Sequence, residues 1–185
     1  MAGQTTGEPA VLRALRGVGA LFLRMPRIAG VLLFVLWTGV IWRLSSLQAK
    51  EEESSFVMGW LVNSGHAPLF GFLAFLALVS LPRSEPFQTL GTTGTIRQWP
   101  RVSALGAAAI LLAVLGYGLV DEWHQSLVPT RDASPWDVMT DMTGAACTLW
   151  IAAYLGDGAA SAKGLAWRIA VGLALCLLAG LNAAT

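Results

Sequence analysis

The chain has 185 residues, of which 12% are charged and 55% are hydrophobic. Soluble globular chains carry about 25% charged residues, and a soluble fold of this size could not hide so much apolar surface. Disordered chains are poor in apolar residues, and a net charge of +1 argues against a nucleic-acid binder. The length accommodates about five membrane helices of roughly 20 residues each. Composition therefore predicts an all-α, polytopic membrane helical bundle.

The N-terminal segment, residues 1–27, is predicted to be cytoplasmic and to precede a transmembrane bundle over residues 28–185. Within residues 10–24, apolar side chains from Val11 to Phe22 recur at helical spacing among arginines, which is typical of an amphipathic helix on a membrane surface. A cleaved signal peptide is disfavoured, because no small-residue cleavage site follows the apolar stretch.

Five stretches are long and apolar enough to cross a bilayer. Their approximate bounds are 28–47, 64–81, 102–119, 136–155 and 165–184. The fourth is the weakest, because Asp137 and Asp141 fall in its first turns. The segment 82–101 is rich in Pro, Gly and Thr and is predicted to be a connector.

Positive charge is sorted between the two sides of this topology. Nine of the 12 Lys and Arg residues lie on the side of the N-terminus. They are Arg13, Arg16, Arg24, Arg27, Arg83, Arg97, Arg101, Lys163 and Arg168. The other three are Arg43, Lys50 and Arg131. The positive-inside rule therefore predicts a multi-pass protein of the cell membrane, with its N-terminus in the cytoplasm and its C-terminus outside.

The same topology brings polar residues from three spans to the outer face. These residues are found at the start of the second span, at the end of the third, in the turn that follows the third, and at the start of the fourth. Ionisable residues within or near membrane spans are costly and are therefore candidate functional residues. The predicted substrate-binding residues are His66, Asp121, Glu122, Gln125, Arg131, Asp137 and Asp141.

Helical spacing places Asp137, Asp141 and Gly144 on one stripe of the fourth span. Two carboxylates at i and i+4 repel each other, so either one holds a proton or a cation lies between them. Arg131 is the nearest cation in the sequence, and it suits either a structural bridge to Asp137 or recognition of an anionic ligand. The small Gly144 predicts that a neighbouring helix approaches closely.

These residues resemble the signature of the VanZ-like membrane protein family. The resemblance is carried by Asp-Glu-Trp-His-Gln at 121–125, Pro-Thr-Arg at 129–131 and Asp-Val-Met-Thr-Asp-Met-Thr-Gly at 137–144, with weaker support from Ser45, Ser46 and His66. It covers roughly residues 30–155. The family resemblance implies a link to low-level teicoplanin resistance but no biochemical mechanism. The chain departs from the family at Asp141, where Asn is usual, and at 63–65, where a Lys often precedes the histidine.

Two classes of function stay open. In the first, an outward-facing polar pocket binds or modulates a lipid-linked or anionic envelope component, with Arg131 and Arg43 contacting the anionic group. In the second, the protein is a hydrolase or transferase acting on a lipid-linked envelope substrate. His66, as general base or nucleophile, and Glu122 are then the catalytic candidates. A transporter is disfavoured, because five spans are few and no inverted repeat is visible.

No cofactor is expected. Metal binding is disfavoured, because neither histidine stands in a His-x-x-x-His or Glu-x-x-His spacing. A nucleophilic Ser126 or Ser134 has no supporting motif. Membrane lipids or lipid-linked cell-wall intermediates are the expected partners, nucleic acid is not, and the oligomeric state is open.

Overall fold

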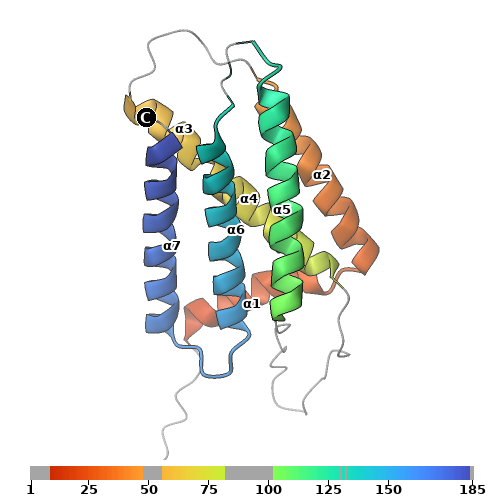
Figure 1. Ribbon diagram of the computed structural model, residues 1–185. Helices are drawn as coiled ribbons and strands as arrows, with labels where there is room; N and C mark the ends of the chain where they lie inside the picture. Colours follow the sequence, from red (N-terminus) through yellow and green to blue (C-terminus); the bar gives the residue numbers. More distant parts are fainter. Residues whose placement is uncertain (1–8, 48–55, 82–101, 130, 132, 184–185) are drawn as a thin grey trace, which may run out of the picture.

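The computed structural model describes residues 9–47, 56–81, 102–129, 131 and 133–183. The predicted connector at 82–101 lies outside the described residues. Seven helices follow one another, and the described residues contain no strand (Figure 1). They are α1 (Ala10–Leu23), α2 (Arg27–Ser45), α3 (Phe56–Ser64), α4 (His66–Ser80), α5 (Ala104–Gln125), α6 (Pro135–Leu155) and α7 (Ala162–Ala183). The predicted all-α class is confirmed.

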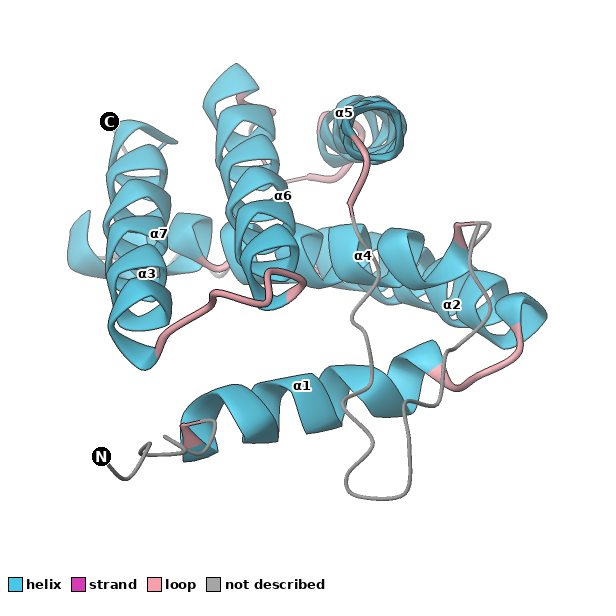
Figure 2. Cartoon of the chain, turned by 90° about the horizontal axis from the view of Figure 1, so that it is seen from below, coloured by secondary structure: helices cyan, strands magenta, loops and turns pink. Residues whose placement is uncertain are grey.

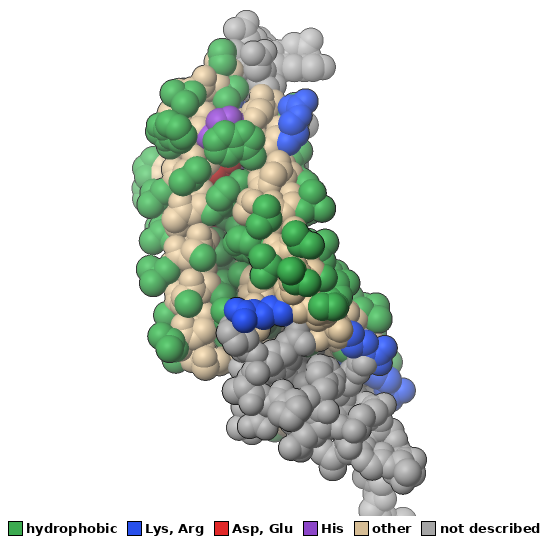
Figure 3. Space-filling view, turned by 90° about the vertical axis from the view of Figure 1, so that its right-hand side faces the viewer, with side chains coloured by type: hydrophobic (Ala, Val, Ile, Leu, Met, Phe, Trp, Pro, Cys, Tyr) green, Lys and Arg blue, Asp and Glu red, His purple; other side chains and the backbone are tan. Residues whose placement is uncertain are grey.

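Five helical stretches are long and apolar enough to cross a membrane, as the sequence predicts. They are Arg27–Ser45, Gly59–Ser80, Ala104–Gln125, Pro135–Leu155 and Ala162–Leu181. Many large apolar side chains on them point away from the protein, including Leu36, Leu105, Leu112 and Trp167. Hydrophobic side chains accordingly cover much of the bundle surface in Figure 3. Such a surface suits acyl chains rather than water, so the chain is a multi-pass membrane protein.

The second span differs from the prediction, because it consists of two helices and begins earlier. The α3 and α4 helices meet at Gly65, whose N–H donates to the carbonyls of Leu61 and Val62 at 3.1 and 3.0 Å. Pro68 explains the break: it has no N–H to offer the Ser64 carbonyl, and its ring crowds that carbonyl. His66 therefore begins α4 but lies about two helical turns inside the span that starts at Gly59, deeper than predicted.

The centre of the bundle is α4, which crosses obliquely behind α5 and α6 in Figure 1 and packs mainly against α6 and α2. Its buried side chains form the core together with residues of α5 and α6. The core includes Phe70, Leu73, Ala74, Ile110, Val114, Ala145 and Leu149. The closest approach is at Gly144, where an added Cβ would lie 2.0 Å from the Ala67 carbonyl oxygen. The predicted role of Gly144 in close helix packing is thus confirmed.

The α1 helix lies at the lower end of the bundle in Figure 1, and Figure 2, seen from that end, shows α1 running along one side of the other helices. Leu12 and Leu23 are buried against the bundle. Arg16 donates from Nε to the Leu155 carbonyl and from Nη2 to the Asp157 carbonyl, both at 2.9 Å. Val18, on another face, is exposed. The predicted segment 1–27 therefore packs on the bundle through α1, and its location on a membrane surface stays a prediction.

Replacing Gly144 with Ala should force α4 and α6 apart, because the new Cβ overlaps backbone atoms of Ala67 rather than a flexible side chain. We expect a loss of about 2–3 kcal/mol in the free energy of unfolding, measured by thermal or denaturant unfolding in detergent. Gly116→Ala is the matched control, because an added Cβ at Gly116 meets nothing within 4 Å. Equal stability of the two variants would contradict the proposed close packing.

Candidate functional site

Three spans bring polar side chains together toward the end of the bundle where α5 ends and α6 begins, which is the upper end in Figure 1 and the predicted outer end. His66 begins α4, the acids and amide of α5 lie in its last turns, and the acids of α6 lie in its first two turns. We call this set the polar cluster: His66, Asp121, Glu122, Gln125, Asp137 and Asp141. Its acids and amide are all buried, and the His66 side chain is 13% exposed.

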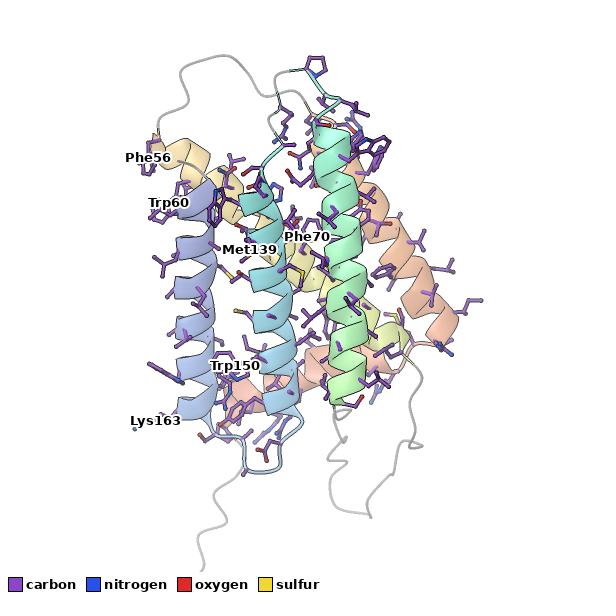
Figure 4. All side chains as sticks on the ribbon, in the orientation of Figure 1. Phe56, Trp60, Phe70, Met139, Trp150 and Lys163 are labelled. Carbon is purple, nitrogen blue, oxygen red and sulfur yellow. The ribbon has the colours of Figure 1, made fainter. Side chains whose placement is uncertain are left out.

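His66 and Asp141 form an imidazole–carboxylate pair between α4 and α6. The Nδ1 atom of His66 lies 3.2 Å from Oδ1 of Asp141. This contact fixes the ring, so that Nε2 remains for another partner. Phe70, which is labelled in Figure 4, is fully buried. Its ring lies nearly parallel to the imidazole of His66, with the two centroids 6.3 Å apart. Phe70 therefore separates the polar cluster from the apolar core.

Glu122 connects α5 to the start of α6. Its Oε2 accepts the Ser134 N–H at 2.6 Å, and its Oε1 accepts from Gln125 Nε2 at 3.3 Å. Ser134 is the N-cap of α6 and accepts the Trp136 N–H at 3.2 Å. In a capping box, the acid at the third helical position accepts the N-cap N–H. Here the Ser134 N–H donates to Glu122 of another helix instead of to Asp137, which is the third residue of α6.

From the sequence, Ser134 is considered only as a nucleophile, and its structural role as the N-cap of α6 is not predicted. The usable signal is the Ser-Pro pair at 134–135 ahead of a helical stretch, because Ser is a favoured N-cap and Pro a favoured first residue. Gly118 is also missed. An added Cβ at Gly118 would lie 3.1 Å from Oδ2 of Asp141, so this glycine leaves room for the carboxylate against α5.

Three carboxylates of the polar cluster have an oxygen that is buried without a hydrogen-bond partner among the described residues. These oxygens are Oδ1 of Asp121, Oδ1 of Asp137 and Oδ2 of Asp141. The charges also act on one another, since Asp141 interacts electrostatically with His66, Asp121 and Asp137. A buried carboxylate oxygen without a donor is costly. The polar cluster therefore has acceptors left for protons, donors or cations.

Arg131 is engaged outside the polar cluster. Its Nε donates to the Leu47 carbonyl at 3.0 Å and its Nη2 to the Leu44 carbonyl at 3.5 Å, at the C-terminal end of α2. A cation is favourable there, because a helix C-terminus carries partial negative charge. Arg131 interacts electrostatically with Asp137, but no ion pair joins these two described residues, so the structural bridge considered for them is not a direct contact.

The second histidine, His124, lies apart from the polar cluster. Its ring stacks on Trp42 with centroids 3.7 Å apart, and its Nε2 lies 3.5 Å from Oγ of Ser46. These partners belong to the end of α2, whereas His66 faces α6. Within the part of the chain that the structure describes, no three His, Cys, Asp or Glu side chains form a group that could hold a metal ion.

Removing His66 should cost stability, because Asp141 would keep its buried charge without the imidazole. We expect His66→Ala to lower the free energy of unfolding by about 3 kcal/mol. Adding Asp141→Leu should recover part of the loss, which gives a coupling energy of about 1–3 kcal/mol in a double-mutant cycle. His124→Ala combined with Asp141→Leu is the control and should be additive. Additivity in the His66 cycle would show that the pair contributes nothing.

A protein-family model described as VanZ/LLP1 matches residues 5–156. The match spans α1 to α6 and includes every residue of the polar cluster. No curated protein matches the chain, and no solved structure does. The family match covers most of the chain and agrees with the motifs at 121–144, so the chain belongs to the VanZ/LLP1 family.

Proposed function

We propose that the polar cluster binds the headgroup of a membrane lipid or of a lipid-linked envelope intermediate at the outer face of the membrane. The observation that carries this proposal is the presence of unpartnered buried carboxylate oxygens in a bundle with an apolar exterior. Exposed apolar side chains flank the polar cluster on both helices that supply its acids: Leu119 and Trp123 on α5, and Trp136 and Met139 on α6. A lipid would contact these side chains and the polar cluster together.

The acidic character of the polar cluster decides how a headgroup would bind. Four carboxyl groups favour the hydrogen-bond-donating part of the headgroup over an anionic part. Arg131, with two of its nitrogens on the α2 carbonyls, supports the turn before α6. Any phosphate would lie outside the carboxylates, toward this turn. This revises the anionic contact expected from the sequence, while the lipid or lipid-linked partner stays the same.

The link to teicoplanin that the family resemblance implies belongs to this proposal. Glycopeptides act on lipid-linked cell-wall material outside the membrane. A protein that binds such material at the outer face would change its presentation to the antibiotic. We therefore propose a modulating role in the envelope, with altered glycopeptide susceptibility as its consequence.

An enzymatic role is the second candidate, and the pairing of His66 with Asp141 favours it. A carboxylate on Nδ1 orients an imidazole so that Nε2 can take a proton from an attacking hydroxyl or water. His66 would then be the general base of a hydrolase or transferase acting on the lipid-linked ligand. Glu122, the other catalytic candidate, has both oxygens occupied by Gln125 and Ser134, which favours a positioning role.

Lipids that co-purify with the protein test the binding role. The protein is extracted in mild detergent, and its retained lipids are identified by mass spectrometry. We expect the wild type to enrich one lipid class, and Asp141→Asn to lower that enrichment at least ten-fold, about 1.4 kcal/mol in binding free energy. Asp157→Asn is the control, because this exposed acid lies beyond the far end of α6. Identical lipid profiles for wild type and Asp141→Asn would overturn the proposal.

The same preparations separate the two candidate functions. Incubation with envelope extract should leave the enriched lipid unchanged if the role is binding alone. Conversion of that lipid by the wild type, lost in His66→Ala, would support the enzyme instead. His124→Ala controls for the general loss of an imidazole near the same face.

The outer location of the polar cluster depends on the orientation predicted from the basic residues. We expect a reporter enzyme fused after Thr185 to be active only outside the cytoplasm, because an odd number of spans follows a cytoplasmic N-terminus. Protease accessibility of the same fusion in whole cells gives an independent reading. A cytoplasmic reporter would show that the five-span count or the orientation is wrong, and the argument for an envelope ligand at the outer face would lose its basis.

A further inference from the structure

We infer that the ligand of the polar cluster carries a protonated primary amine, and that its ammonium group binds the free carboxylate oxygens of Asp121, Asp137 and Asp141. This inference depends on the proposed headgroup binding and names its chemical class.

The charge of the polar cluster is unbalanced. It contains four carboxyl groups and one imidazole, and the buried polar residues of the described chain include no Lys or Arg. Glu122 interacts electrostatically with Asp137, Asp141 and His66, so the groups share one local field. Buried carboxylates that interact in this way must either take up protons or bind a cation. A cationic ligand would remove the repulsion.

The free acceptors match an ammonium group in number. One buried oxygen on each of Asp121, Asp137 and Asp141 lacks a partner, and each of these side chains is at least nine-tenths buried. A primary ammonium has three N–H donors and no acceptor. Ca²⁺ and Mg²⁺ need about six or more oxygen ligands, more than these three acids leave free. The organic cation is therefore the better fit.

The donors that could have satisfied these oxygens are used elsewhere in the structure. The Ser134 N–H, which an acid at the position of Asp137 would bind in a capping box, goes to Glu122 at 2.6 Å. The Gln125 amide goes to Oδ2 of Asp121 at 2.9 Å and to Glu122. The Arg131 guanidinium donates hydrogen bonds to the Leu47 and Leu44 carbonyls at the end of α2. Because these donors bind elsewhere, one oxygen on each of Asp121, Asp137 and Asp141 is left without a donor.

Two sources could supply the amine: the headgroup of an aminophospholipid and a soluble amine from outside the membrane. We test them on purified, delipidated protein by native mass spectrometry with phosphatidylethanolamine, its N-acylated form and phosphatidylglycerol. N-acylation removes the positive charge and keeps the rest of the lipid. We expect at least ten-fold stronger retention of phosphatidylethanolamine than of the other two. Displacement by millimolar glycerophosphoethanolamine would show that the headgroup alone suffices; retention against it would assign the site to the intact lipid.

Two isosteric variants make the test specific. Asp121→Asn and Asp137→Asn should each lower phosphatidylethanolamine retention at least ten-fold. In the lipid-free state, both should unfold at a temperature equal to or above that of the wild type, because each removes a buried carboxylate charge that is costly to desolvate. Loss of binding without loss of stability therefore excludes a folding defect. Asp157→Asn should change neither quantity.

The outcomes also distinguish this inference from the function on which it rests. Equal retention of all three lipids, lowered by Asp141→Asn, would overturn the amine inference and leave headgroup binding in place. The same holds if Asp121→Asn and Asp137→Asn bind phosphatidylethanolamine as the wild type does. Failure of the wild type to retain any of the lipids above the level of Asp141→Asn would overturn both.

Discussion

The contact between the backbones of α4 and α6 at Ala67 and Gly144 sets the geometry of the whole site. His66 precedes Ala67 by one residue, and Asp141 precedes Gly144 by nearly one helical turn. The register that seats the Ala67 carbonyl against Gly144 therefore also brings the imidazole of His66 to the carboxylate of Asp141. Close helix packing, which contributes dispersion energy in a membrane, here determines the position of an ionisable pair.

Side chains in and beside the polar cluster form hydrogen bonds with the ends of helices other than their own. The acid on α5 caps α6, and the arginine of the connecting turn supports the end of α2. Both contacts stabilise helix ends, where backbone groups lack partners within the helix. These contacts also affect the electrostatics of the site. The Ser134 N–H and the Arg131 guanidinium are bound at the edge of the polar cluster, and carboxylate oxygens without a hydrogen-bond partner remain inside it. The acid-rich interior thus follows from how the helices are capped.

The sequence was sufficient to predict the spans and the meeting of three of them at one polar region. Length and hydropathy locate the spans, and alternating topology places Asp121, Asp137 and His66 at the same end. The break at Gly65 has a local signal in Pro68, but hydropathy alone extends across it. The partners of Arg131 and the bond from Ser134 to Glu122 depend on how α2, α5 and α6 meet in space, which residue spacing does not encode.

The departure from the family pattern at Asp141 has a structural counterpart. The family resemblance makes Asn usual at this position, whereas here a carboxylate faces His66 at 3.2 Å. An amide can accept the same hydrogen bond but carries no charge. The substitution therefore changes the charge of the pair without requiring a side chain of a different shape. The sequence identifies position 141 as a departure from the family, and the structure identifies His66 as its partner.

The two ends of α6 are both held by side chains from other helices. Glu122 binds the Ser134 N–H at the start of α6, and Arg16 of α1 binds the carbonyls of Leu155 and Asp157 at its other end. Sliding α6 along its axis would break the bonds at both of its ends. The level of Asp141 relative to its partner His66 on α4 is thus fixed within the bundle, so that a thinner or thicker membrane would act on the bundle as a unit and leave the pair in register.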